Sequence, residues 1–265
     1  LRYPSDLTQG EWAVVAPLIR GARRGGRPRT VNVREVLNAI FCVLSTGCQW
    51  QALPKDLPPK STVWGYFSPL GVGGHARAPP PRALRGGARA VRPRGQPDRR
   101  DHRQPDVEGH AKGGWTLHPS GYDAGKKTLG RKRHILTDTL GLLLAVVVHR
   151  ADVQDRDGAE PLLRQARRLF PFVERIIGDA GYQGPKMAAA VARTGSWGIE
   201  ILRRCDRHRF VVLPKRRIVE RTLGWISHHR RLARDFERHC RIAAAFVRVA
   251  MIRIMLQRLA PRCST

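Results

Sequence analysis

Residues Arg133 to His149 read RHILTDTLGLLLAVVVH, and their pattern predicts the fold class. Two runs of apolar and β-branched residues, His134 to Thr137 and Leu142 to Val148, flank a polar turn at Asp138 to Gly141. Such runs on either side of an Asp- and Gly-containing turn are typical of a β-hairpin. The chain therefore contains the start of an antiparallel sheet.

Alternating helical and strand patterns follow this hairpin. They fall at 160–169 (helix), 175–178 (strand), 185–192 (helix), 199–202 and 210–213 (strands) and 217–259 (one long amphipathic helix or a helix pair). The short apolar strand at 175–178 ends directly before Asp179. Strands that alternate with helices predict an α/β fold in which helices flank a mixed sheet.

Residues 1–68 have a different, helical character. Thr8 and Glu11 have capping-box spacing before an apolar run, and Asn32 and Glu35 repeat that spacing before a second amphipathic segment. A basic, glycine-rich loop, GARRGGRPRT, separates the two segments. Short helices with a basic loop fit a helix-turn-helix-like domain that binds DNA. They fit a plain helical cap on a larger domain equally well.

Residues 69–118 are unlike the rest of the chain. Of these 50 positions, 31 are Arg, Pro, Gly or Ala, while Ile, Phe, Tyr, Met and Ser do not occur. Neither a helical nor a strand period survives, and the three prolines at 79–81 would break either element. The ordinary interpretation of this aberrant segment is a disordered basic linker.

The charge balance points to a polyanionic partner. Lys and Arg total 49 against 21 Asp and Glu, which gives a formal net charge of +28. A hydrophobic share of 42% argues against a wholly disordered tail, and no apolar run is long enough to cross a membrane. The sequence shows no secretion-signal pattern, and its five cysteines form no CxxC pair. We therefore expect a cytoplasmic, nucleoid-associated protein with reduced thiols and no membrane partner.

Two acidic residues are candidates for chemistry. Asp179 follows an apolar strand, where open α/β sheets place active-site groups, although it could equally cap a turn. Glu220 borders an apolar helical face among several arginines, as a metal ligand or as a salt-bridge partner. Two carboxylates in such basic surroundings suit Mg²⁺ (or Mn²⁺) and a phosphate substrate. A pair of such ions supports phosphodiester transfer.

A basic stretch leads into the hairpin. Its cations would contact the DNA backbone, which gives affinity and salt dependence without sequence choice; they are Lys126, Lys127, Arg131, Lys132 and Arg133. The alternative is a solvated charged loop.

Several long motifs resemble those of bacterial insertion-sequence transposases of the IS-five group. YPSDLTQGEW, GGRPR, VREVLNAIFCVLSTGCQWQALP and STVWGYF are similar to the N-terminal helical region of that family. GYDAGKKTLGRKRHILTDTLGLLL, DAGYQG and IVERTLGWISHHRRLARDFE are similar to its catalytic core. The resemblance covers 1–68 and 119–260. It implies that 119–260 form an RNase H-like DDE domain, which performs metal-dependent DNA cleavage and strand transfer.

The resemblance also implies roles for single residues. Asp179 matches the second catalytic, metal-binding carboxylate and Glu220 the third. The helix around that glutamate contacts element-end DNA in the family, and here it carries Arg221, Trp225, Arg230 and Arg231. The implied partners are double-stranded DNA, both terminal inverted repeats and target DNA, and a second copy of the chain in a homodimer on DNA.

The first catalytic aspartate departs from the family pattern. The family carries it on the first core strand, in an Ile-Ile-Asp-Ser-like run before GYDAGKK, and that region falls within 69–118. Asp98, Asp101 and Asp106 lie there in Arg- and Pro-rich sequence, without the β-branched residues of a central strand. The codons of 101–104, read one base later, permit Ile-Ile-Asp followed by Ser. We therefore hypothesise that about 69–118 are translated out of frame and that the first core strand is missing.

Three functions stay open at this point. The chain could be a DDE transposase by ancestry that is catalytically dead or nearly so. It could be a non-catalytic DNA-binding remnant that occupies element ends. A structural nucleic-acid protein of the ribosomal type would explain the charge, but not the motifs around Asp179 and Glu220.

Overall fold

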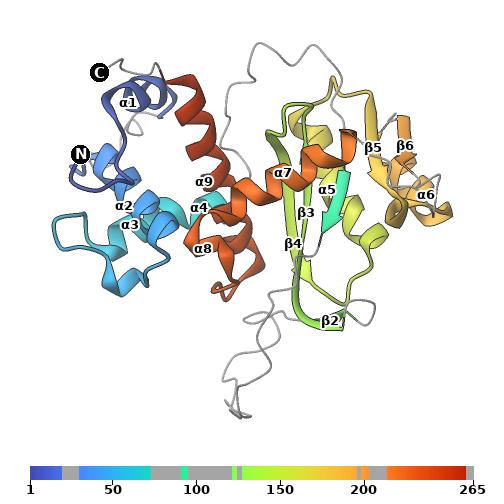
Figure 1. Cartoon of the computed structure of the whole chain (residues 1–265), viewed down its shortest axis with the longest axis horizontal. Helices are drawn as coiled ribbons and strands as arrows, with labels where there is room; N and C mark the ends of the chain where they lie inside the picture. The colour runs from blue at the N-terminus through green and yellow to red at the C-terminus, as the bar shows by residue number, and fades with distance from the viewer. Residues whose placement is uncertain are drawn as a thin grey trace, which may run out of the picture. The chain divides into compact units, whose positions relative to one another are not determined.

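A computed structural model of the chain describes residues 1–19, 30–72, 91–94, 121–123, 127–195, 198–202 and 214–260. The chain divides into two compact units, each discontinuous in sequence (Figure 1). The first unit takes in 1–79, 226–233 and 245–265, and the second takes in 80–225 and 234–244. The last helix therefore belongs largely with the N-terminal helices, whereas the sequence motifs assigned all of 119–260 to one domain.

The first unit is helical, as predicted for 1–68. Its elements are α1 (Gln9–Val15), η1 (Ala16–Leu18), α2 (Val33–Thr46), η2 (Trp50–Ala52), α3 (Lys60–Phe67), α4 (Pro69–Val72), α8 (Arg230–Ala233) and most of α9 (Cys240–Leu259). The predicted capping box starts α1, because the Thr8 hydroxyl accepts from the Glu11 N–H at 3.1 Å and the Glu11 carboxylate accepts from the Thr8 N–H at 2.8 Å. Asn32 caps α2 without a reciprocal bond from Glu35, which pairs with Arg2 instead.

The helix α9 completes the core of this first unit. Phe246 packs against Phe67 with ring centroids 4.4 Å apart, and Trp50 joins the same aromatic cluster. Further along α9, the guanidinium of Arg253 donates to the buried Glu11 carboxylate at 2.9 Å. A charge pair and an aromatic cluster thus attach the last helix to the first ones.

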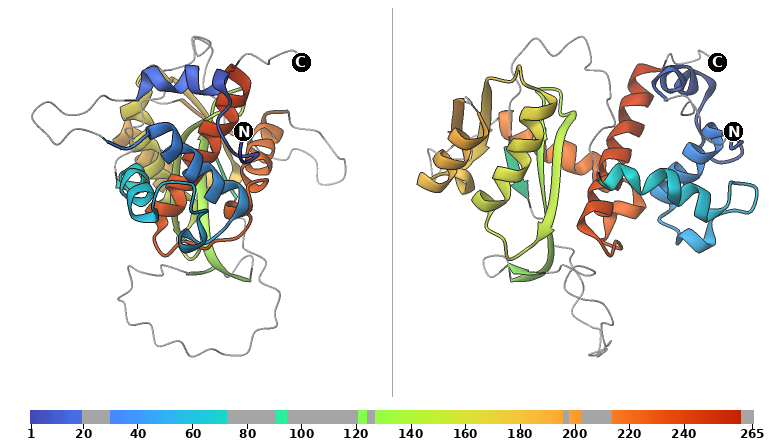
Figure 2. Two further views of the ribbon diagram at one scale, coloured as in Figure 1. Left: turned by 90° about the vertical axis from the view of Figure 1, so that its left-hand side faces the viewer. Right: turned by 180° about the vertical axis from the view of Figure 1, so that it is seen from behind.

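The second unit is a mixed sheet between helices. Its elements are β1 (Val91–Arg94), β2 (Gly121–Asp123), β3 (Thr128–Thr137), β4 (Leu143–Arg150), α5 (Asp155–Leu169), β5 (Arg175–Asp179), η3 (Ala180–Tyr182), α6 (Pro185–Thr194), β6 (Gly198–Leu202) and most of α7 (Pro214–Ser227). The strands are ordered β4-β3-β1-β5-β6, with β2 paired to the start of β3. Pairing is antiparallel from β4 to β1 and parallel from β1 to β6. The two views in Figures 1 and 2 show α5 on one face of this sheet and α7 across the other.

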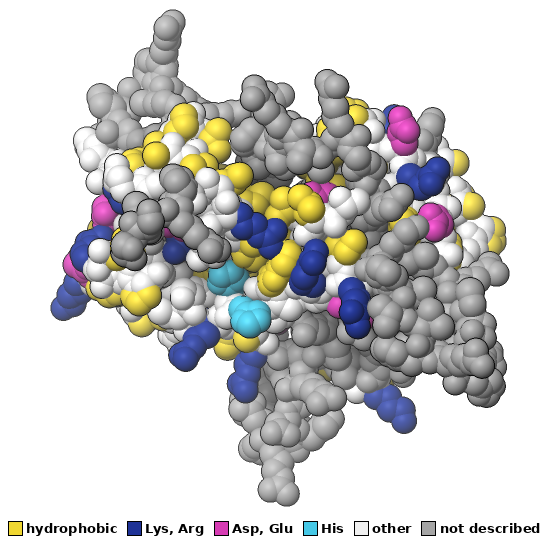
Figure 3. Space-filling view, turned by 45° about the horizontal axis from the view of Figure 1, so that its top comes forward, with side chains coloured by type: hydrophobic (Ala, Val, Ile, Leu, Met, Phe, Trp, Pro, Cys, Tyr) yellow, Lys and Arg dark blue, Asp and Glu magenta, His cyan; other side chains and the backbone are white. Residues whose placement is uncertain are grey.

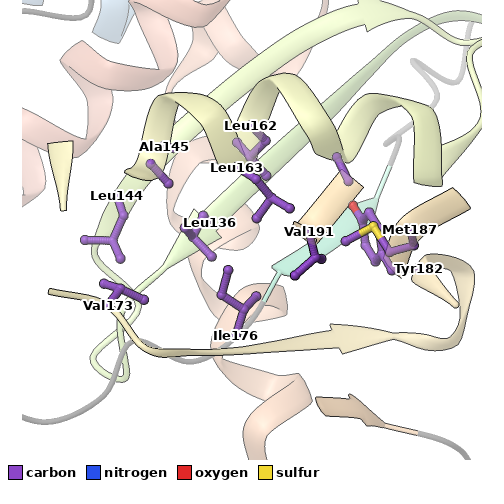
Figure 4. Close-up of a cluster of buried hydrophobic side chains, with 12 residues drawn as sticks. Leu136, Leu144, Ala145, Leu162, Leu163, Val173, Ile176, Tyr182, Met187 and Val191 are labelled. Atoms are coloured by element: carbon purple, nitrogen blue, oxygen red, sulfur yellow. The ribbon is translucent and has the colours of Figure 1, made fainter. Parts of the chain in front are cut away.

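The core of this unit lies between the sheet and the helices α5 and α6 (Figure 4). Its buried side chains come from both layers and include Leu136, Leu144, Leu162, Leu163, Ile176, Met187 and Val191. The predicted hairpin, strand and helix pattern is confirmed here, and with it the mixed α/β fold class. The predicted strand at 210–213 lies outside the described residues, and the predicted helix or helix pair at 217–259 consists of α7, α8 and α9.

One expectation is corrected by the structure, namely the loss of the first core strand. A four-residue strand, β1, stands between β3 and β5, inside the segment that carried no strand pattern. It pairs with β3 from Val91↔Leu136 to Arg94↔Arg133 and meets β5 at Val91↔Gly178. Backbone N–H and C=O groups pair whatever the side chains are, so Arg-rich sequence can still occupy a ladder, although Pro93 supplies no N–H to it. The strand nevertheless reads VRPR and supplies no carboxylate.

Candidate functional site

Asp179 stands at the end of a central strand. It is the last residue of β5, it is half-buried, and β5 runs parallel to both β1 and β6. The residue therefore lies at the carboxyl edge of the parallel strands, where open α/β sheets carry their reactive groups. This is the position that the sequence predicted for it.

A second carboxylate, that of Asp155, lies close to the same strand end, beside Tyr182 and Gly181. Tyr182, only 1% exposed, shares a hydrogen bond of 2.9 Å between its hydroxyl and His134 Nδ1. Burial raises the pKa of this hydroxyl well above its ordinary value, and the negative charges of Asp155 and Asp179 add to the shift. A Cβ on Gly181 would meet Asp155 Oδ2 at 3.4 Å, so Asp155 packs against the turn that follows Asp179. Sequence reasoning missed Asp155, which is separated from Asp179 by a whole helix.

The ammonium group of Lys132 neutralises this acidic region from inside the protein. Its side chain is 8% exposed, and Nζ lies 3.1 Å from Asp123 Oδ2 and 3.3 Å from Asp155 Oδ1. Nζ also donates to the carbonyl of Val153 at 3.0 Å. A DNA phosphate could reach Lys132 only by displacing a buried ion pair, which is costly.

Arg131, the neighbouring predicted DNA contact, is also engaged within its own unit. Its guanidinium lies 3.3 Å from the Asp235 carboxylate and donates to the Glu237 carbonyl at 2.6 Å. Successive residues of a strand point to opposite faces, and both faces of β3 are covered. Two cations of the basic run, Arg131 and Lys132, are therefore engaged in ion pairs that stabilise the fold.

The other cations of this run are placed differently. Lys127 is exposed in the turn before β3, with φ of 51°. Arg133 is half-buried on β3, and Lys126 lies outside the described residues. Contact with DNA stays a prediction for all of them.

Glu220 is held on a helix that is fixed to the β3–β4 turn. The residue is half-buried on α7 beside the buried Val219. Two residues on, the Thr222 hydroxyl donates to the carbonyl of Gly141 at 2.7 Å. Gly141 has φ of 86°, and a Cβ there would meet the Thr222 hydroxyl at 2.7 Å, so the turn requires glycine. The TDTLG turn thus sets the register of the helix that carries Glu220.

Arg221 and Trp225 form an exposed cation–π pair on α7. The Arg221 guanidinium lies 4.9 Å from the Trp225 ring centroid and donates to the Leu140 carbonyl at 3.0 Å. Its side chain is exposed, and Trp225 is half-buried. The ring holds the exposed Arg221 guanidinium in place, and contact with DNA stays a prediction for both residues.

Arg230 and Arg231 belong to the first unit and differ in exposure. Arg230 is exposed, whereas Arg231 is buried, donates to the Cys48 carbonyl at 2.9 Å and lies 5.3 Å from the Phe246 ring centroid. Arg231 thus helps to hold α8 on the helical core. Of the two, Arg230 is the one placed to meet a ligand.

A stacked pair of histidines was not anticipated from the sequence. The rings of His134 and His149 lie 4.3 Å apart on β3 and β4, beneath Gly158 of α5. Burial lowers the pKa of His149, and the nearby Lys132 lowers it further, whereas a hydrogen bond with the Arg150 backbone raises it. Only the register between β3 and β4 brings these two histidines together. Their separation in the sequence matches no metal-binding spacing, so the sequence alone does not indicate the pair.

These residues do not complete a metal centre. Within the described ranges, no three His, Cys, Asp or Glu side chains are grouped so that they could hold a metal ion. Asp179 and Glu220 are present, but β1 offers no carboxylate where a third ligand of the predicted set would stand. Among the residues that the structure describes, the donors therefore do not make up the metal site of a complete DDE centre.

Comparison with known families decides the ancestry. Residues 94–255, more than half of the chain, match the model of the transposase DDE domain. The chain belongs to the DDE-domain transposases. Residues 7–75 match a second model, described as a putative transposase of the IS4/5 family, which confirms the predicted insertion-sequence ancestry.

One relative supports the same assignment. The chain is 32% identical over 127 residues to a putative transposase for insertion sequence element IS402 from Burkholderia cepacia. The match takes in 45% of this chain and spans 60% of the length of the relative. No solved structure matches the chain. Among its described helices, none is long and apolar enough for a membrane span.

Proposed function

We propose that this chain is a DNA-binding descendant of an insertion-sequence transposase that contacts element ends and no longer cleaves them. The observation that carries the proposal is the missing carboxylate on β1, the strand between β3 and β5. DDE-domain transposases depend in general on divalent metal ions, for which carboxylates are the usual ligands. Asp179 and Glu220 would be the two surviving members of that set.

The basic surface supports DNA binding independently of cleavage. Net charge is +28, and basic side chains recur across the described surface, as on the face drawn in Figure 3. The exposed cations Arg221 and Arg230, with Lys127, are the proposed phosphate contacts, and Trp225 supports Arg221. Such contacts give strong salt dependence because each one releases counterions.

The experiment combines binding and cleavage on one DNA. Short duplexes from the sequence that flanks the gene are titrated with the full chain at rising salt, and nicking is followed with Mg²⁺ or Mn²⁺. We expect binding that weakens steeply with salt and no nicking above the level of the Asp179→Asn, Glu220→Gln double variant. Metal-dependent nicking that this double variant abolishes would falsify the proposed inactivity. Binding that does not respond to salt would overturn the electrostatic part.

The out-of-frame origin of 69–118 is a proposal that the gene itself can test. Sequencing the coding DNA across codons 65–125 from a fresh isolate distinguishes two outcomes. One reading frame that encodes Ile-Ile-Asp-Ser before GYDAGKK would mean that an intact version of the protein exists, whereas a confirmed shift of frame would make this chain a decayed transposase. A protein carrying that restored segment should regain metal-dependent nicking that Asp179→Asn removes. A restored protein that folds, binds DNA and still fails to nick would mean that the missing aspartate is not the cause.

A further inference from the structure

The hairpin of β2 and β3 presents an apolar pair to solvent. Tyr122 and Leu129 are directly opposite each other in the register, and they are 56% and 59% exposed. Directly opposed residues on antiparallel strands lie on the same face of the ladder. An aromatic ring and a leucine thus form one exposed apolar face, named here the Tyr122–Leu129 face.

The opposite face of the hairpin is anchored to the second unit. Asp123 pairs with the buried ammonium of Lys132 at 3.1 Å. Gly121 is buried, and a Cβ there would meet the Asp152 backbone nitrogen at 2.7 Å, so the two segments are in close contact. The Ala151 N–H donates to the Gly130 carbonyl at 3.0 Å. The Tyr122–Leu129 face is therefore displayed by a fixed element.

The charges around this face favour a polyanion. Asp123 is neutralised by Lys132, and Asp152 is paired with Arg150 at 2.8 Å. Lys127, in the turn between the strands, is exposed and forms no ion pair with any residue that the structure describes. The local balance beside the apolar pair is thus positive, like that of the whole chain. A second copy, also at +28, would meet this face with like charge.

We propose that the Tyr122–Leu129 face contacts unpaired bases at an opened DNA end, with Lys127 on the adjoining phosphate. A ring and a leucine offer little to the hydrogen-bonding edges of a closed duplex, but they bind the faces of unstacked bases. This inference rests on the DNA binding proposed above and adds the state of the DNA that is recognised.

The test compares two DNA substrates of the same sequence. One is a blunt duplex, and the other has a few unpaired bases at one end, with 2-aminopurine at the first unpaired position. The full chain and its variants are titrated by anisotropy and by 2-aminopurine emission. We expect Tyr122→Ala to weaken binding to the open end by about fivefold or more, the loss expected from removing one stacking ring. Binding to the blunt duplex should stay within about twofold.

Two variants separate stacking from folding and from general charge. Tyr122→Leu keeps an apolar partner for Leu129 but removes the ring, so it should lose the emission change while its melting temperature is unchanged. Lys127→Ala should weaken both substrates alike. Phe172→Ala removes another exposed ring of the same unit, 51% exposed, and serves as the matched control with wild-type binding to both.

Each outcome has a defined meaning. Loss confined to the open end, with the Phe172→Ala control unchanged, supports the inference. Equal binding of both substrates by wild-type and Tyr122→Ala proteins overturns it while leaving the proposed DNA binding intact. Absence of binding to either DNA overturns both proposals. A Tyr122-dependent change of mass in sedimentation without DNA would show that the face receives a second copy instead.

Discussion

Lys132 on β3 and Arg221 on α7 are both cations for which the sequence predicted a DNA contact, and their surroundings differ sharply. Lys132 is 8% exposed between two carboxylates, Asp123 and Asp155. Arg221 is exposed, stacked on Trp225 and hydrogen-bonded to the Leu140 carbonyl. The first cation contributes to the stability of the unit, whereas the second is available to a ligand.

A basic run therefore does not by itself identify a nucleic-acid surface. In GRKRH, Arg131 and Lys132 pair with acidic residues from other parts of the chain. The partner of Arg131, Asp235, is 104 residues away in the sequence. The effect of substituting each cation separates the two roles. Substitution of the buried type should change the free energy of unfolding, and substitution of the exposed type should change DNA affinity.

The largest effect is expected for Lys132→Met. The substitution leaves Asp123 and Asp155 facing each other without the cation between them, and breaking a buried ion pair in this way costs about 3 kcal/mol. Urea denaturation at neutral pH measures it. The double variant Lys132→Met, Asp155→Asn should recover part of the lost free energy of unfolding, because it removes the repulsion between the carboxylates of Asp123 and Asp155.

Lys186 gives the matched control for this prediction. It is exposed on α6 of the same unit, and Lys186→Met should change the free energy of unfolding by less than about 0.5 kcal/mol. Equal, small effects at 132 and 186 would contradict the internal role of Lys132 and return it to the set of possible DNA contacts.

A smaller effect is expected in the pH dependence of stability, and it involves His149, the residue beside Lys132. His149 pairs with Lys132 in the strand register, and burial lowers its pKa, assisted by the Lys132 charge. An unfolded histidine takes up its proton near pH 6.5, before the folded one does, so this contribution to stability is present above about pH 6.5 and is lost as pH falls. The loss cannot exceed about 1.4 kcal/mol per pH unit for one group.

Denaturation midpoints followed downward from neutral pH measure this slope. His149→Gln should flatten it, while part of the slope remains because burial and Arg253 also lower the pKa of His229. A wild-type stability that rises as pH falls from neutral would contradict a lowered pKa for the half-buried His149.

The smallest effect on stability is expected for Arg221→Ala. An exposed cation should change the free energy of unfolding by no more than about 0.5 kcal/mol, while the slope of log affinity against log salt for DNA falls by about one unit. Arg193→Ala, which removes another exposed cation of this unit, is the control and should leave DNA affinity near wild type. Identical salt slopes for both variants would place Arg221 outside the DNA surface.

Local patterns predicted much of the fold. The TDTLG turn, the alternation after it and the capping box at Thr8 and Glu11 depend on neighbours in the sequence, and all three occur in the structure. The position of Asp179 at a strand end was predicted for the same reason.

The parts that failed or were missed depend on distant partners. β1 is determined by the unpaired edges of β3 and β5 and not by its own residues, which include Pro93. Asp155 comes beside the Asp179 turn only after α5 and β5 have packed together. The membership of α9 in the first unit likewise rests on contacts such as Phe246 with Phe67, which no local pattern reveals.

The pair of Glu11 and Arg253 has a consequence for the order of events during synthesis. The two residues are 242 positions apart, and the carboxylate of Glu11 is buried when they meet. A ribosome adding roughly 5–20 residues per second leaves Glu11 without this partner for many seconds. The N-terminal helices therefore reach their final packing only after translation of α9. A messenger RNA that ends before α9 yields a protein whose first unit lacks this packing.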